Sequence, residues 1–125
     1  MRVVDTSLWI EVFTRGPLLE EAKHAALPLN ECIVPAIVHY ELAKWSSRLL
    51  PNAQAQDVVS LLTKCVLVDM DKTVAIEAAR LSLLHKLHAT DAIIYATARL
   101  MDTKLYTCDA HFADLPEVKF WPKPS

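Results

Sequence analysis

Short apolar runs alternate with longer segments of helical periodicity along most of this chain, and this alternation limits the possible folds most. Each run has three to five residues, too few for a helix, and most are rich in Val or Leu. Four runs stand out: Arg2–Val4, Cys32–Val34, Cys65–Val68 and Lys104–Cys108. Strands that alternate with helices pair in parallel and are covered on both faces. We therefore expect an α/β fold, a three-layer α/β/α sandwich around a central, mainly parallel sheet of four to five strands, with 118–121 as a fifth, edge strand.

Prolines and the single glycine mark the ends of the expected helices. Gly16-Pro17 separates two short helices, Pro35 opens a long one, and Pro51 ends it. The expected helices cover residues 7–14, 18–26, 36–50, 53–64 and 73–87, and a last helix starts at Thr90 or Asp91 and extends to residue 101.

Length and composition indicate one folded domain, residues 1–125. The 125 residues are 53% apolar, which is enough for a single core, and no linker or repeat suggests a second domain. The net charge of −2 gives no global attraction for polyanions. Binding to nucleic acid would therefore depend on a local basic patch or on a bound metal.

The sequence favours a soluble protein of the cytoplasm. Cys32, Cys65 and Cys108 are odd in number and lie in strand-like runs, as expected of buried free thiols in a reducing compartment. Asp5 and Glu11 interrupt the N-terminal apolar stretch, so no secretory signal is visible. No apolar run approaches the ~20 residues of a membrane span.

Four acidic residues, Asp5, Glu41, Asp91 and Asp109, flank apolar segments that belong in the core. Asp5 and Asp109 follow strands, so both should lie at the carboxyl edge of the sheet, where parallel sheets place their sites. Glu41 lies on a helix roughly 9 Å beyond Pro35, and Asp91 begins another helix, so both can reach that edge. Two carboxylates about 4 Å apart repel each other by roughly 4 kcal/mol at an effective dielectric constant near 20. A divalent cation is the simplest way to stabilise such a cluster.

Four segments, VDTSLWIEV, VPAIVHYELAKW, TDAIIYATA and LYTCDAHF, resemble in this order the PIN domain family, in particular the VapC-type ribonuclease toxins of toxin–antitoxin modules. The resemblance implies endonucleolytic cleavage of RNA that depends on Mg²⁺ or Mn²⁺. The catalytic acids would be Asp5, Glu41, Asp91 and Asp109. We expect Asp5, Asp91 and Asp109 to bind the metal directly, while Glu41 acts through water or orients the nucleophile. The family also implies a homodimer and a protein antitoxin.

Hydroxyl and basic side chains complete the expected site. Thr6, or alternatively Ser7, and Thr107 match family hydroxyls that support the acids or contact phosphate. Arg15, Lys44 and Arg48 are candidate RNA contacts, although each could be an ordinary surface charge. Trp9 and Trp45 are expected as core or interface anchors. His85 and His88 lack the partners of a zinc site.

The chain also departs from the family pattern. Met101-Asp102-Thr103 stands where family members often have a glycine in the turn before the last strand, and Asp114 is a possible outer fifth acid. Simple structural explanations exist for the four acids: helix capping for Asp5 and Asp91, a solvated helix face for Glu41, and turn formation for Asp109.

Three other functions compete with a nuclease toxin. Asp69, Asp71 and Thr73 resemble the D-x-D-x-T motif of haloacid-dehalogenase-type phosphatases, but too little chain follows for that fold, and capping of the next helix explains these residues better. A PIN-like interaction module without activity is the second alternative, which the retention of all four acids disfavours. A PIN nuclease of RNA maturation is the third.

Overall fold

The computed structural model describes residues 1–125 and builds one sheet of five strands, all parallel, in the order β3-β2-β1-β4-β5. In the register of the sheet, Val3 on the central strand lies opposite Ile33 on one side and Leu105 on the other. The strands are β1 Arg2–Val4, β2 Cys32–Pro35, β3 Val66–Val68, β4 Lys104–Thr107 and β5 Val118–Phe120. The expected parallel sheet is confirmed, including its fifth, edge strand.

Six α-helices and two short 3₁₀ turns connect the strands. They are α1 Thr6–Thr14, α2 Leu19–Ala26, η1 Leu29–Glu31, α3 Ala36–Leu49, α4 Asn52–Leu62, α5 Lys72–His85, α6 Ala89–Leu100 and η2 Ala110–Phe112. All six helices lie within a few residues of the expected ranges. The helix α6 begins at Ala89, one or two residues before the expected start at Thr90 or Asp91. Its N-cap is His88, so Asp91 lies inside the first turn.

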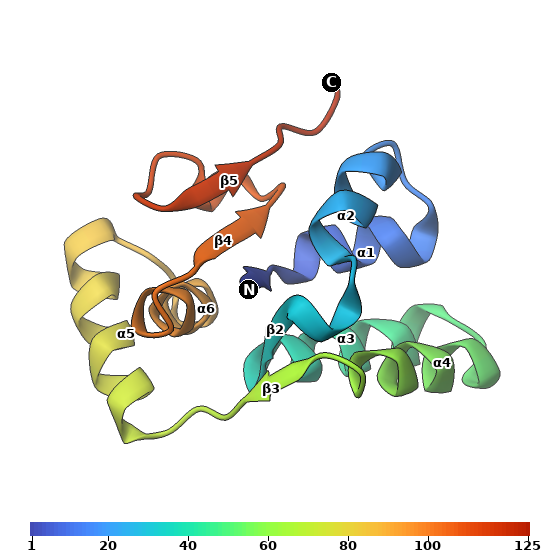
Figure 1. Ribbon diagram of the computed structural model, residues 1–125, viewed down its shortest axis with the longest axis horizontal. Coiled ribbons are helices and arrows are strands. Elements are labelled where there is room, and N and C mark those ends of the chain that lie inside the picture. Colours follow the sequence, from blue (N-terminus) through green and yellow to red (C-terminus); the bar gives the residue numbers. More distant parts are fainter.

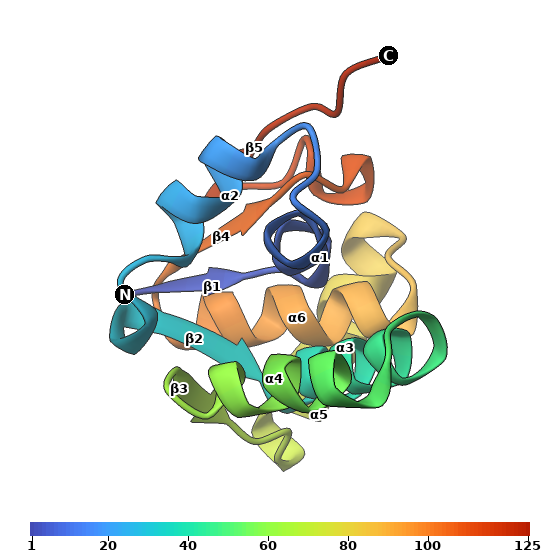
Figure 2. The same ribbon diagram turned by 90° about the vertical axis from the view of Figure 1, so that its right-hand side faces the viewer.

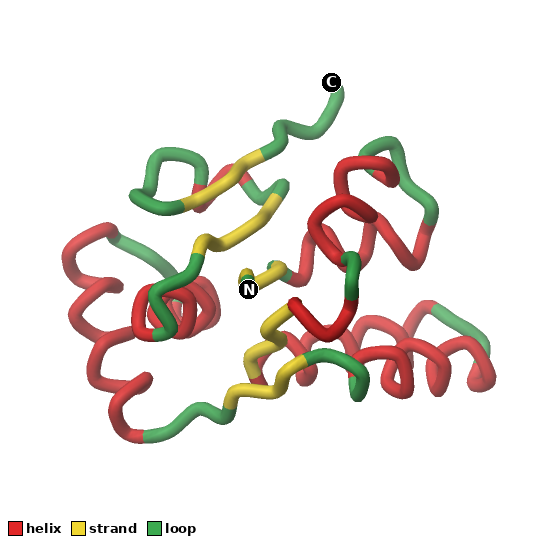
Figure 3. The backbone as a smooth tube through the Cα atoms, in the orientation of Figure 1, coloured by secondary structure: helices red, strands yellow, loops and turns green.

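Helices cover both faces of the sheet, which confirms the three-layer α/β/α sandwich. In Figure 1, α5 and α6 (yellow and orange) lie on one side of the strands, and α1 to α4 (blue to green) lie on the other. The strands occupy the middle of the molecule and the helices surround them (Figure 3). None of the helices combines the length and the hydrophobicity that a membrane span requires.

The order of the strands creates a switch point beside β1. The chain first adds β2 and β3 on one side of β1, then crosses by α5 and α6 to place β4 on the other side. Figure 2 shows β1 leading from the N-terminus straight into α1. In open parallel sheets, sites form outside the carboxyl ends of the strands at such a point. The residues that follow β1 and β4 therefore face a common space.

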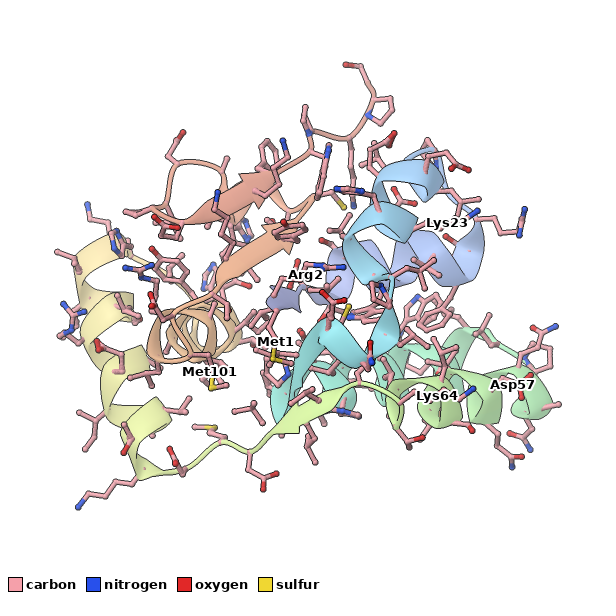
Figure 4. All side chains as sticks on the ribbon, viewed as in Figure 1. Met1, Arg2, Lys23, Asp57, Lys64 and Met101 are labelled. Atoms are coloured by element: carbon pink, nitrogen blue, oxygen red, sulfur yellow. The ribbon has the colours of Figure 1, made fainter.

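The core forms where the central strands meet the helices. Val3, Val4 and Leu105 on the central strands are fully buried, as the continuous apolar character of parallel strands predicts. Trp9 is also fully buried, and its indole nitrogen donates to the Val4 carbonyl at 3.2 Å, which confirms it as a core residue. At the outer end of β1, Arg2 extends towards α2, and its Nε donates to the Ala25 carbonyl at 2.6 Å (Figure 4).

The cysteines match the expectation of free thiols, and the turn before β4 contains a residue in the left-handed region. All three cysteines are free; Cys32 and Cys108 are buried, and Cys65 is partly buried. Asp102 has a φ of 54°, in the left-handed region where glycine is most easily accommodated. Aspartate tolerates this region better than most side chains, which explains how the turn forms without a glycine.

Candidate active site

One pocket at the carboxyl edge of the sheet contains all four predicted acids. It has a volume of about 230 Å³. Its lining consists of Asp5, Thr6, Ser7, Ile10, Glu41, Asp91, Asp109 and Lys123. The acids come from the ends of β1 and β4, the second turn of α3 and the first turn of α6. Four distant segments therefore supply carboxylates to one small space.

Asp5 is the most buried of these acids, with 3% of its surface exposed. It follows β1 directly and caps α1. Its Oδ2 accepts hydrogen bonds from Ser7 Oγ at 2.7 Å, from Thr107 Oγ1 at 2.8 Å and from the Ser7 backbone N–H at 3.4 Å. All three bonds end on Oδ2. Capping and metal binding are thus compatible, because Oδ1 keeps its lone pairs for a cation.

Two neighbouring hydroxyls support different acids. Thr6 Oγ1 donates to Glu41 Oε1 at 2.6 Å, whereas Ser7 Oγ is bound to Asp5. Ser7 Oγ also accepts from the Cys108 backbone N–H at 3.1 Å, which ties the start of α1 to the end of β4. The residue that holds the first acid is therefore Ser7, and Thr6 positions the second.

Asp91 and Asp109 lie together with a histidine that was not among the sequence candidates. His111 Nδ1 is 3.2 Å from Asp91 Oδ2 and 3.5 Å from Asp109 Oδ1. The ligand atoms of these three residues all lie within 4.8 Å of one another. The position of His111, two residues beyond the last acid, was the available signal for it in the sequence. Asp114, the possible fifth acid, is exposed and does not line the pocket.

Three carboxylates of the pocket, Asp5, Glu41 and Asp91, have pKa values raised above those of ordinary side chains. Burial raises the pKa of Asp5 to about 6, although hydrogen bonds from Ser7 and Thr107 oppose the rise. The pKa of Glu41 is raised by burial and then by the charges of Asp91 and Asp109, against the Thr6 hydrogen bond. Burial and the charge of Asp109 raise the pKa of Asp91, while His111 lowers it. Four carboxylates and a single lysine, Lys123, line this pocket, so its donors suit a hard divalent cation.

A larger groove of about 430 Å³ adjoins the acids, and Glu41 lines both spaces. The groove is also lined by Tyr40, Lys44, Trp45, Arg48, Leu49 and Thr90. Lys44 and Arg48, two of the predicted RNA contacts, thus lie beside the acids. The third, Arg15, lies outside, exposed at the far end of α1.

Asp69 and Asp71, the residues of the phosphatase alternative, lie outside the pocket. Both are exposed after β3, at the edge of the sheet, and Asp71 caps α5 by accepting from the Val74 backbone N–H at 2.9 Å. The interpretation of these acids as helix-capping residues is confirmed for Asp71.

Comparison with known proteins identifies the family of this chain. The PIN domain family model matches residues 2–118, so this chain belongs to the PIN domain family. No curated relative matches the chain in sequence. Among solved structures, a toxin–antitoxin complex from Klebsiella pneumoniae is 28% identical with a TM-score of 0.81, and the alignment covers 95% of this chain and 96% of that one.

More distant structures show the fold. VapC20 of Mycobacterium tuberculosis, a sarcin-ricin loop cleaving toxin, is 20% identical with a TM-score of 0.80, and the alignment covers 98% of this chain and 100% of VapC20. VapBC2 of Rickettsia felis, bound to a fragment of promoter DNA, is 16% identical with a TM-score of 0.76 over 96% of this chain and 98% of that one.

Proposed function

We propose that this chain is a metal-dependent endoribonuclease and the toxin of a type II toxin–antitoxin module, acting in the cytoplasm as a single domain. The convergence of Asp5, Glu41, Asp91 and Asp109 in one pocket of a PIN fold carries this proposal. The likeness to the toxin–antitoxin complex from Klebsiella pneumoniae supports the assignment as a toxin.

Asp5, Asp91 and Asp109 would hold the Mg²⁺ or Mn²⁺ ion. The free Oδ1 of Asp5 and the mutual repulsion of Asp91 and Asp109 suit such an ion. When bound, a divalent ion lowers the pKa of a coordinated water and neutralises charge on the leaving oxygen of a phosphodiester.

Glu41 would orient the attacking water and accept its proton. Thr6 holds Oε1, so Oε2 is the oxygen that is free to act on water. The raised pKa of Glu41 makes it a better proton acceptor than an ordinary glutamate. Lys123 lines the same pocket and would contact the phosphate of the reacting nucleotide.

The groove beside Glu41 would receive a single strand of RNA. Lys44 and Arg48 supply positive charge for phosphates, and the exposed ring of Tyr40 lies 5.8 Å from Lys44 Nζ. Such a pairing of cation and aromatic ring is typical of sites that stack a base and hold its backbone.

Two apolar surfaces support the proposed protein partners. A groove of about 320 Å³ between α1 and α4 is lined by Phe13, Leu50, Val58 and Leu61 among others, and would receive an apolar segment of the antitoxin. On α5, Ile76, Leu83 and Leu84 are exposed by 61%, 85% and 63%, which fits a contact between two copies of the chain.

Cleavage of RNA by wild type and by Asp5→Asn, followed by sequencing of the new RNA ends, tests the activity. We expect the variant to lose more than about a hundredfold in rate, the equivalent of roughly 3 kcal/mol of transition-state stabilisation. The exposed Asp69→Asn is the matched control and should cleave normally. EDTA should stop the wild type without unfolding it. Equal rates in wild type and Asp5→Asn would rule out this site.

The alternative role in RNA maturation keeps the same active site and differs in its context. A small adjacent open reading frame whose product binds this chain and inhibits cleavage would identify a toxin. A chain that binds no such product and trims defined precursor RNAs would be a maturation nuclease.

A further inference from the structure

We propose that His111 is a direct ligand of the metal ion, so that the site binds through nitrogen as well as oxygen and selects Mn²⁺ over Mg²⁺. This inference rests on the proposed metal site of the nuclease, and it adds a ligand and a metal preference to that site.

The distances suit one ion shared by three side chains. His111 Nδ1 lies 3.2 Å from Asp91 Oδ2 and 3.5 Å from Asp109 Oδ1. Adjacent ligands of an octahedral ion with bonds of about 2.1 Å are roughly 3 Å apart. The two contacts of His111 therefore match neighbouring corners of one coordination sphere. All three donor atoms lie within 4.8 Å of one another, so small shifts would accommodate one ion.

The backbone holds His111 at this place. Asp109 ends the segment after β4 and caps η2, and its Oδ1 accepts from the His111 backbone N–H at 2.9 Å. This bond positions the backbone of His111, and the imidazole then reaches the carboxylates of Asp91 and Asp109. The His111 side chain is 63% exposed, so an ion can reach Nδ1 from solvent.

A second explanation is that His111 only neutralises the two carboxylates as an imidazolium and leaves when the ion arrives. The two explanations differ in the bound state. A ligand contributes nitrogen to the coordination of the ion, whereas a counter-charge does not.

The donor set determines the expected preference. Mg²⁺ favours oxygen ligands and retains its waters. Mn²⁺ also favours oxygen and binds nitrogen least tightly among the first-row transition metals, but it accepts an imidazole more readily than Mg²⁺ does. Replacement of His111 should therefore weaken Mn²⁺ binding and leave Mg²⁺ binding nearly unchanged.

Pulsed electron paramagnetic resonance of Mn²⁺ added to the full chain at pH 7.5 provides the direct test. We expect a ¹⁴N coupling from a coordinated imidazole in the wild type and its loss in His111→Ala. His88→Ala is the matched control, because its ring lies 5.9 Å from that of His111 without touching the acids. Titration with Mn²⁺ should show at least about a tenfold loss of affinity in His111→Ala, with Mg²⁺ affinity, measured by competition, changed less than twofold.

The outcomes separate this inference from the proposed function. Bound Mn²⁺ without a ¹⁴N signal, or a signal that survives in His111→Ala, overturns the inference and leaves the nuclease proposal intact. A ¹⁴N signal that depends on His111 in a chain that cleaves no RNA supports the ligand and contradicts the nuclease. A wild type that binds no Mn²⁺ overturns the inference, and one that binds neither Mn²⁺ nor Mg²⁺ overturns the metal-dependent nuclease as well.

Discussion

Thr107 Oγ1 donates to Asp5 Oδ2 at 2.8 Å, and this bond joins residues 102 positions apart in the sequence. The same hydroxyl accepts from the Asp109 backbone N–H at 2.9 Å. A single buried side chain at the end of β4 therefore positions the first and the last acid of the site. Its hydroxyl oxygen serves as donor and acceptor at once, which a methyl group cannot do.

Thr107→Val should destabilise the chain and weaken its metal site. The replacement keeps the shape of the side chain but leaves the Asp109 N–H and one lone pair of Asp5 unpaired, at a cost of about 1–3 kcal/mol. Urea unfolding with and without Mn²⁺ measures both effects. Thr107→Ser keeps the hydroxyl and should lie much closer to wild type; equal losses in both variants would contradict the bridging role.

The metal-free protein should lose stability as pH rises through the titration of Asp5. The pKa of this group is raised from 3.8 to about 6, so the folded chain binds its proton more tightly than the unfolded chain does. Its contribution is complete below pH 4 and is lost as pH rises towards 6 and above, by about 3 kcal/mol at 1.36 kcal/mol for each unit of pKa. Asp5→Asn cannot titrate. In EDTA, the free energy of unfolding of the wild type should fall relative to this variant from pH 4 to 7. Parallel profiles would contradict the raised pKa.

Thr6→Val should move the acid limb of the cleavage rate to higher pH. The Thr6 hydrogen bond lowers the pKa of Glu41, so its loss raises that pKa further, and the carboxylate needed as proton acceptor forms only at higher pH. Thr6→Ser retains the donor and serves as the control. The pH dependence of kcat/KM measures the shift, and an unmoved acid limb would remove Glu41 from the proton transfer.

Lys44→Ala should weaken RNA binding in a salt-dependent way. Each phosphate contact to a single strand contributes about −0.7 to the slope of log K against log salt, so the slope should become shallower by about that amount. Fluorescence anisotropy in the inactive Asp5→Asn background measures binding without cleavage. The exposed Lys64, which follows α4, is a control of the same charge (Figure 4). Equal effects of Lys44→Ala and Lys64→Ala would mean that RNA does not bind in the groove beside Glu41.

Asp102→Val should destabilise the chain, whereas Asp102→Gly should not. At a φ of 54°, glycine is unstrained, while a β-branched residue is a clear outlier. Thermal unfolding should show Asp102→Gly to be as stable as wild type or up to about 1 kcal/mol more stable, and Asp102→Val to be less stable by about 1–2 kcal/mol. The reverse order would mean that the turn has another shape.

The sequence carries enough information for the fold and for the location of the acids. Short apolar runs alternate with segments of helical periodicity, and prolines such as Pro35 and Pro51 mark where a helix begins and ends. Strands that alternate with helices in this way form a parallel sheet. Asp5 and Asp109 follow strands, so their place at one edge of the sheet follows from connectivity alone. Glu41 and Asp91 could be added because helix geometry allows a reach to that edge.

The finer contacts of the site depended on the tertiary structure. Thr6 and Ser7 are neighbours in sequence, but successive residues of a helix point about 100° apart, so only the packed helix decides that Ser7 supports Asp5 and Thr6 supports Glu41. His111 lies between two acids because the turn after β4 folds back towards α6, a contact across 20 residues that no local pattern encodes. The sequence by itself therefore determined which residues form the elements and the acidic edge. Packing alone decided the hydrogen-bond partners of each carboxylate and the burial that raises the pKa values of Asp5, Glu41 and Asp91. Both depend on which distant segments come together and exclude water from the site.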